Sequence, residues 1–331
     1  MSALESNSPI SKANKVIESN MIKVQIIHQL KQMSQVLIGL IAIYSTFWIL
    51  APDFRNIDTL LTILTQASVL GILACGTTIV LISGGLDLSV GSIFAVVGVV
   101  VGICLSIYEL PVWLAVIIGL FTGGLCGFIN GFIQVSTGVP AFIVTLGGLT
   151  AYKGIAEILA NGKDLSQFPE SFHVFGSGYV TPTLIMFACA LLVGIFLRKT
   201  RTGSHAYAIG GNEEIARLSG VNVTKSRIIY YMIGGLMAAI AAIIQVSRLD
   251  FAQSSRGVSY ELFAIAAVVI GGTSLFGGRG GVSRTIIGIL IMQTIIVGLA
   301  YLGVGTSFQR IAIGVIIVLA VWLDVFKGKS K

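Results

Sequence analysis

Charged residues are scarce in this sequence, and their scarcity argues against a soluble protein. Of the 331 residues, 55% are hydrophobic and only 11% are charged, whereas a soluble domain has about 25% charged residues. Asp, Glu, Lys, Arg and His are all absent from 59–86, 88–108, 110–152, 174–197, 228–247 and 285–309. Because a helix needs about 20 apolar residues to cross the hydrocarbon core, each stretch can hold one span, and 110–152 can hold two. The stretches do not alternate apolar and polar residues, which excludes a transmembrane β-barrel and favours helices.

The sequence also lacks the motifs of an enzyme or a metalloprotein. Its three histidines, His28, His173 and His205, are scattered over polar segments. The four cysteines lie within apolar runs and show no metal-ligand spacing. No Gly-x-x-x-x-Gly-Lys-Ser/Thr loop is present, so we expect that this chain does not hold ATP phosphates itself. Neither catalysis, nor a metal, nor a cofactor is expected.

The apolar segments predict an all-α polytopic membrane protein with about ten transmembrane helices and some glycine-broken segments. The predicted spans are 35–51, 60–82, 88–108, 112–135, 140–160, 182–197, 227–247, 262–276, 285–302 and 310–326. An eight-span arrangement, in which 262–302 forms one re-entrant region and one span, stays open. The predicted domains are a tail at 1–34, a transmembrane domain at 35–326 and a short tail at 327–331.

The positions of the basic residues predict the orientation of the chain. The net charge is +7, and the basic residues gather beside apolar runs, in the tail 1–34, the loop 198–226 and the tail 327–331. With ten spans these segments share one side, which the positive-inside rule assigns to the cytoplasm, while loop 161–181 lies outside. This clustering argues against nucleic acid as a partner. Residues 1–34 lack the apolar core of a signal peptide, and a surface helix is expected around 22–33.

Glycine is abundant, with 40 residues, and it predicts both close helix packing and broken helices. Gly119, Gly123 and Gly127 are spaced four residues apart, so they share a helix face that a neighbour can approach closely. Other glycines close apolar runs, because residues 84–91 and 271–278 both match Gly-Gly-x-x-Leu-x-x-Gly. Interrupted segments at corresponding places in two halves point to a transport site. Whether the chain is internally duplicated stays open.

Asp87 is the only acidic residue between Asp58 and Glu109. A charge at membrane depth costs roughly 2.5–3.5 kcal/mol, so it has a reason to be there. One interpretation is that Asp87 is the N-cap of the span that begins just after it. The other is that its carboxylate accepts hydrogen bonds in or beside a substrate path. Asn130, in a glycine-rich stretch that we read as a polar break, is interpreted as forming a hydrogen bond between helices.

The polar segment 200–226 predicts one short helix. Asn212 suits the N-cap, and Glu213 and Glu214 suit the positive end of the helix dipole. Arg217 falls near the last turn, and Gly220 falls just past the end. A capped helix of two turns needs a surface to lie against, which belongs either to this chain or to a partner.

These segments together resemble the ribose-type permease subunits of ATP-binding-cassette (ABC) importers, in the branched-chain amino acid and sugar permease superfamily. Residues 82–92, ISGGLDLSVGS, are similar to a hallmark of that family. Residues 208–214, AIGGNEE, with 216–222, ARLSGVN, are similar to its cytoplasmic loop, and 260–274, YELFAIAAVVIGGTS, resemble a third hallmark. The similarity extends from about residue 35 to the end, with the motifs in the same order as in the family.

The resemblance implies a permease that moves a small sugar, either a ribose-like monosaccharide or a polyol, by alternating access across a bacterial inner or cell membrane. The implied partners are a second permease copy, two ATPase subunits inside, an extracytoplasmic sugar-binding protein outside and the surrounding membrane lipid. It also implies that the helix 212–219 is the coupling helix, seated in a cleft of the ATPase. The expected contacts are Gly210, Gly211, Asn212, Glu213, Glu214, Ile215, Ala216, Arg217, Leu218, Ser219 and Gly220.

A translocation path is hypothesised along Gly85, Asp87, Ser89, Asn130 and Phe263. The sequence departs from the family pattern at two positions. Phe263 stands where the family usually has Asp, and Arg284 stands where a small residue is common, which leaves the exact sugar and the gate open.

Three other functions are alternatives to a sugar permease. An ion-coupled secondary transporter would favour several ionisable residues within the membrane, and this chain has essentially one, Asp87. An ABC permease for a solute other than a sugar stays open. The glycine-broken spans argue against a membrane scaffold that transports nothing.

Overall fold

The computed structural model describes residues 33–329, so the surface helix expected around 22–33 lies outside the described residues except for its last position. The described chain is almost entirely helical, as predicted. Its helices are Met33–Leu50, η1 (Pro52–Arg55), α3 (Ile57–Ile82), α4 (Val90–Ser106), α5 (Val112–Thr137), α6 (Ala141–Ala160), η2 (Glu170–Phe175), α7 (Val180–Lys199), α8 (Arg201–Gly211), α9 (Glu213–Leu218), α10 (Val223–Leu249), α11 (Tyr260–Ile270), α12 (Val282–Tyr301) and α13 (Thr306–Lys329). Two short strands, β1 (Leu165–Ser166) and β2 (Phe251–Ala252), pair antiparallel.

Each predicted span overlaps a helix, but only seven helices among the described residues are long and apolar enough to cross a membrane. The predicted span 262–276 needs a correction. The helix there, α11, has 11 residues, a length of about 16 Å at 1.5 Å per residue. That is about half of the 30 Å hydrocarbon core, so α11 is a half-helix followed by a loop.

The two glycine-broken segments end their helices in the same way. α3 stops before Gly84 (φ +76°) and α11 stops before Gly272 (φ +82°), both in the left-handed region that glycine adopts without strain. Each glycine N–H donates to the carbonyl three residues earlier, and the next N–H donates to the carbonyl five residues earlier. Gly84 therefore corresponds to Gly272, whereas the sequence motif aligns Gly84 with Gly271, so the motif is displaced by one residue.

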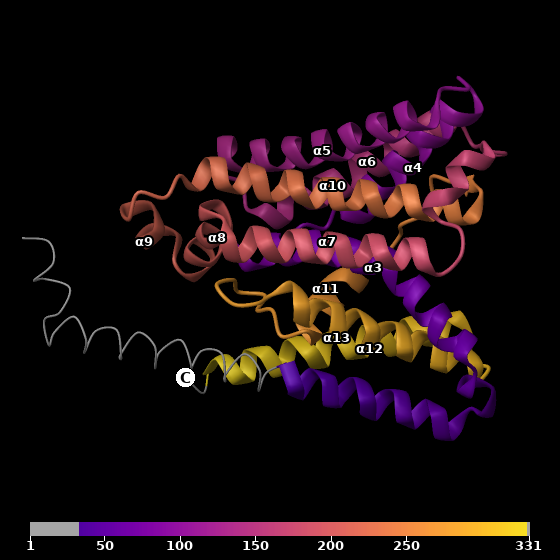
Figure 1. Ribbon diagram of the computed structural model, residues 1–331. Coiled ribbons are helices and arrows are strands. Elements are labelled where there is room, and N and C mark those ends of the chain that lie inside the picture. The colour runs from indigo at the N-terminus through magenta and orange to yellow at the C-terminus, as the bar shows by residue number, and fades with distance from the viewer. Residues whose placement is uncertain (1–32, 330–331) are drawn as a thin grey trace, which may run out of the picture.

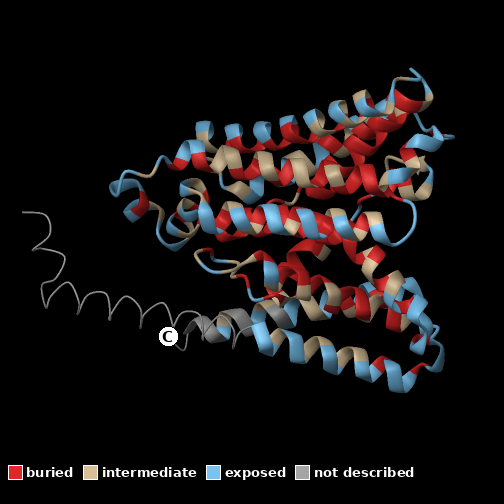
Figure 2. Cartoon of the chain, in the orientation of Figure 1, coloured by how far each residue is buried: buried red, intermediate tan, exposed pale blue. Residues whose placement is uncertain are grey.

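α3 is buried continuously from Ala67 to Ile82 and lies among α10, α12, α7 and α11 (Figures 1 and 2). α5 and α10 lie side by side, and Figure 2 shows α5, α7 and the helix Met33–Leu50 with exposed outer faces. The close approach predicted for the glycines of α5 is confirmed. A Cβ on Gly123 would lie 2.5 Å from the Gly235 carbonyl of α10, and a Cβ on Gly127 would overlap the Tyr231 carbonyl.

α10 connects the two ends of the molecule. Near its start, the Tyr230 hydroxyl donates to the carbonyl of Thr202 on α8, and near its end the Ser247 hydroxyl donates to the carbonyl of Phe172 in η2. Figure 1 shows α8 and α9 at one end of the bundle, with the end of α13 on the same side. The segments 198–226 and 161–181 therefore lie at opposite ends, as a topology with one inside and one outside requires.

Candidate functional site

Asp87 lies in the turn between α3 and α4, with its side chain only 1% exposed. Its Oδ1 accepts hydrogen bonds from the Ser89 backbone N–H (2.8 Å) and the Ser89 hydroxyl (2.6 Å). Its Oδ2 is buried without a hydrogen-bond partner among the described residues. The interpretation of Asp87 as N-cap is wrong, because α4 begins at Val90 and the N-cap position therefore falls on Ser89. Asp87 instead closes the turn two residues before the helix.

Asn130 links three helices through this turn. Its Nδ2 donates to the Ser89 hydroxyl (2.7 Å), and its Oδ1 accepts from the Tyr152 hydroxyl of α6 (2.9 Å). The predicted hydrogen bond between helices is thus confirmed. The predicted polar break around Asn130 is absent, since α5 runs unbroken from Val112 to Thr137. The neighbouring glycines serve close packing on α10 rather than a break in the helix.

The backbone of the same turn is held by two more helices. The Leu86 carbonyl accepts from the hydroxyls of Thr145 on α6 (3.1 Å) and Tyr231 on α10 (3.4 Å). A Cβ on Gly85 would lie 2.9 Å from the Tyr231 hydroxyl, so a larger residue at this position would have to displace the tyrosine. Tyr152 and Tyr231 were missed by the sequence analysis. Their signal was the presence of tyrosines in apolar runs, since a buried tyrosine hydroxyl usually needs a hydrogen-bond partner.

Four of the five residues hypothesised for the translocation path are therefore adjacent: Gly85, Asp87, Ser89 and Asn130. They form a packed polar cluster inside one copy of the chain rather than the lining of an open passage. Phe263 is not part of these hydrogen bonds. It lies half-buried on α11 against the core. Arg284 lies at the second break, where its backbone carbonyl packs against Gly271.

The cytoplasmic-loop sequence forms two helices, α8 and α9, and not the single helix that was predicted. α8 begins at a Thr200 cap whose hydroxyl accepts from the Gly203 N–H (2.9 Å). Its sequence, RTGSHAYAIGG, has three glycines and little local helix preference. The helix is stabilised by packing, because Gly203, Ala206 and Ile209 are buried. Packing of this kind cannot be read from local propensity.

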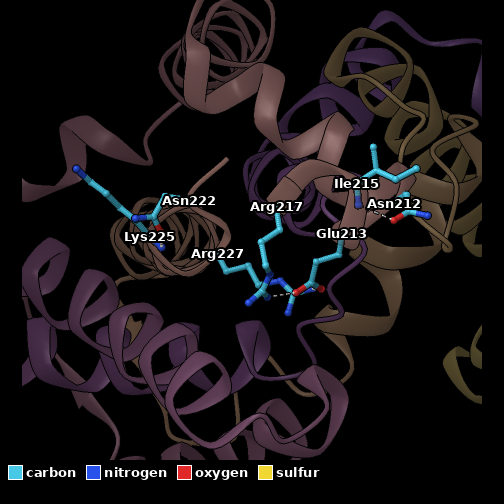
Figure 3. A network of polar contacts seen from close by, with 7 residues as sticks. All are labelled: Asn212, Glu213, Ile215, Arg217, Asn222, Lys225 and Arg227. Carbon is cyan, nitrogen blue, oxygen red and sulfur yellow. Dashed lines mark hydrogen bonds and ion pairs between the residues drawn. The ribbon is translucent and has the colours of Figure 1, made fainter. Parts of the chain in front are cut away.

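The caps predicted for α9 are confirmed. The Asn212 side chain accepts from the Ile215 N–H (3.0 Å), and Gly220 just past the end has φ +84°. Figure 3 shows the polar contacts around this helix. Glu213 forms ion pairs with Arg217 (2.9 Å) and with Arg227 of α10, so its carboxylate ties α9 to the bundle.

The apolar side chains of α9 divide into one buried and two exposed residues. Ala216 is buried, whereas Ile215 is 61% exposed and Leu218 is 83% exposed. Polar Glu214 is exposed beside them. Two exposed apolar residues on a short, capped and ion-paired helix form a surface that a protein partner can cover.

The end of α8 packs against both glycine-broken segments. A Cβ on Gly210 would overlap the Ile82 carbonyl at the end of α3 and would lie 2.5 Å from the Gly278 nitrogen. The Gly278 N–H itself donates to the Ile82 carbonyl (2.9 Å). The neighbouring Gly211 has open space around its added Cβ. We call this contact of Gly210, Ile82 and Gly278 the glycine junction. It joins the end of α8, just before α9, to the end of α3 and to the loop that follows α11.

The chemistry of the described residues gives no sign of a metal centre. No group of three or more His, Cys, Asp or Glu side chains among them could hold a metal ion. The four cysteines are all buried as free thiols.

Comparisons with known proteins agree over most of the chain. Residues 59–321 match the family described as branched-chain amino acid transport system / permease component. The Ribose import permease protein RbsC of Haemophilus influenzae is 41% identical over 303 residues, which cover 89% of this chain and 93% of that protein. The L-arabinose transport system permease protein AraH of Escherichia coli is 36% identical over 301 residues, 88% of this chain and 92% of that protein.

A third relative has a lower sequence identity. The Fructose import permease protein FrcC of Rhizobium meliloti is 34% identical over 288 residues, 83% of this chain and 80% of that protein. No solved structure matches the chain. The matched region includes both glycine-broken segments, the polar cluster and the helices α8 and α9, and the chain therefore belongs to the branched-chain amino acid transport system / permease family.

Proposed function

We propose that this protein is the membrane-spanning permease subunit of an ABC importer for a ribose-like monosaccharide. ATP hydrolysis takes place on a separate ATPase subunit, and an extracytoplasmic binding protein delivers the sugar. A second copy of the permease, or a paralogue, completes the passage between two subunits. The sugar class is supported by three relatives that align over most of their length and are named as permeases for ribose, L-arabinose and fructose.

The observation that carries the proposal is the surface of α9. Ile215 and Leu218 are exposed on a helix that forms its own caps and its own ion pairs. Only a partner can therefore remove those two side chains from water. The end of α8, through Gly210, connects this surface to the end of α3 and to the loop after α11. An ATPase that binds α9 differently in its two nucleotide states can bias the transporter between its two states through that connection.

The orientation belongs to the same proposal. The segments 198–226 and 327–331 face the cytoplasm with the ATPase, and 161–181 faces the binding protein outside. The polar cluster around Asp87 is proposed to support the translocation path from behind, since its side chains are buried within one copy. Phe263, half-buried on the half-helix α11, is proposed to lie on the path.

The experiment is reconstitution of sugar uptake in proteoliposomes. The permease is combined with its proposed ATPase and binding-protein partners, and uptake of radiolabelled ribose, arabinose and fructose is measured with ATP inside. We expect uptake only when all three components and ATP are present. Uptake by the permease alone, driven by a proton or sodium gradient, would contradict the proposal. Uptake of an amino acid and of no sugar would retain the ABC permease and refute the sugar.

A further inference from the structure

A groove of about 540 Å³ opens between α7 and α12 at the end of the molecule that carries α8. Its walls are apolar and include Leu191 and Ile195 of α7 and Val282 and Ile286 of α12. It follows α7 from residue 187 to 199, a length of about 18 Å at 1.5 Å per residue. One leaflet of the hydrocarbon core is about 15 Å thick, so the groove is about as long as an acyl chain in one leaflet.

The outer rim of the groove belongs to the surface that faces lipid. Phe187, Leu191 and Ile195 are spaced four residues apart on α7, and all three are exposed. Gly194 leaves a gap in this wall, because a Cβ built on it meets nothing within 4 Å. In a bilayer, an apolar groove on such a face is filled by hydrocarbon.

One end of the groove is strongly basic. Arg198 and Lys199, the last two residues of α7, line it and are exposed. Neither forms an ion pair with any residue that the structure describes. Burial raises the pKa of the nearby Tyr207 hydroxyl on α8, and the positive charges of Arg198 and Arg284 oppose that shift. Two positive charges, those of Arg198 and Lys199, therefore lie at one end of an otherwise apolar groove.

We propose that this groove binds one anionic phospholipid of the cytoplasmic leaflet, with an acyl chain between α7 and α12 and its phosphate on Arg198 and Lys199. The charges are complementary, since the cytoplasmic leaflet is the anionic one and basic pockets between transmembrane helices bind anionic head groups. The choice of leaflet rests on the orientation proposed above, whereas the binding itself does not depend on transport. A lipid held there contacts the start of α12 just after the break that follows α11.

The test uses the full chain, purified in detergent and delipidated. Lipid binding is measured by native mass spectrometry and by the shift of the thermal unfolding midpoint, with phosphatidylglycerol and phosphatidylcholine compared. We expect one tightly retained phosphatidylglycerol per chain and little retention of phosphatidylcholine. Gly194→Leu should fill the groove and abolish that retention. The matched control is Gly154→Leu on α6, where an added Cβ also meets nothing within 4 Å, and it should retain the lipid.

Variants of the two basic residues test the head-group contact separately from the acyl-chain contact. Arg198→Gln and Lys199→Gln should each weaken phosphatidylglycerol binding about fivefold, as expected for the loss of one basic contact with an anionic surface. Lys225→Gln removes an exposed charge at the start of α10, away from the groove, and should change nothing. Equal retention of both lipids would overturn the head-group site. If glycerol phosphate stabilised the protein as much as phosphatidylglycerol does, the proposed acyl-chain binding would be refuted. If Gly194→Leu changed the oligomeric state, the groove would instead be a contact with a second copy of the chain.

Discussion

Truncating Leu218 should separate the stability of this protein from its binding to the ATPase. In the free permease Leu218 is 83% exposed, so Leu218→Ala removes almost no buried contact, and the free energy of unfolding should change by less than about 0.5 kcal/mol. If an ATPase covers the side chain, the same substitution removes about three buried carbons at about 0.8 kcal/mol each, or about 2.4 kcal/mol in total. At about 1.4 kcal/mol per tenfold change, the ATPase should bind about 50-fold more weakly.

The measurement is the Kd of the ATPase for the permease in nanodiscs, with transport-stimulated ATP hydrolysis measured in parallel. Leu218→Arg should bind still more weakly, because it places an unpaired charge in an interface. Ser204→Arg is the matched control, since it adds the same charge at an exposed position of α8 and removes no apolar side chain. Should Leu218→Arg bind and stimulate the ATPase as wild type does, α9 is not the contact and the reasoning fails.

Three further predictions follow from other parts of the molecule. Gly210→Ala should lower uptake at least tenfold while the ATPase still binds, because its Cβ overlaps the Ile82 carbonyl. Gly211→Ala, whose Cβ meets nothing within this chain, should reduce uptake far less, and equal uptake by the two variants would exclude a role for the glycine junction. Asp87→Ala loses both hydrogen bonds to Ser89, at about 1 kcal/mol each, and should reduce the folded protein recovered from membranes. Asp87→Asn keeps an acceptor for both bonds and should transport within about twofold of wild type; loss of uptake at a normal protein level would show that the negative charge itself is needed. Cysteine labelling from outside should reach Ser171→Cys and miss Ser204→Cys, with little background because the four native cysteines are buried, and the reverse pattern would invert the topology.

Features governed by neighbouring residues could be predicted from the sequence. The caps of α9 are an example, because Asn212 and Gly220 act on backbone groups within three or four residues of themselves. The packing face of α5 is another, since a spacing of four places glycines on one side of any helix. The helical segments were visible for the same reason, since each contains a continuous apolar run, although the span predicted at 262–276 proved to be a half-helix.

Features governed by distant contacts could not be predicted. The Leu86 carbonyl accepts from Tyr231, 145 residues away, and Asn130 bonds to Ser89, 41 residues away. No spacing rule connects such pairs before the helices are arranged. The half-length of α11 was missed for a related reason. The predicted span extended past Gly271 and Gly272 to residue 276, whereas the left-handed backbone at Gly272 shows that the helix has already ended.

The glycine junction shows why glycine content alone was ambiguous in this chain. Gly84 and Gly272 are needed for their backbone conformation, whereas Gly210 is needed because another backbone occupies the space of its side chain. The requirements of Gly84 and Gly210 meet at one place, where the ends of α3 and α8 and the loop after α11 touch through backbone atoms. Backbone contacts have no side-chain rotamers to absorb a displacement. If the proposed ATPase on α9 shifts α8, the end of α3 and the loop after α11 must move with it, or the hydrogen bond between Gly278 and Ile82 must break.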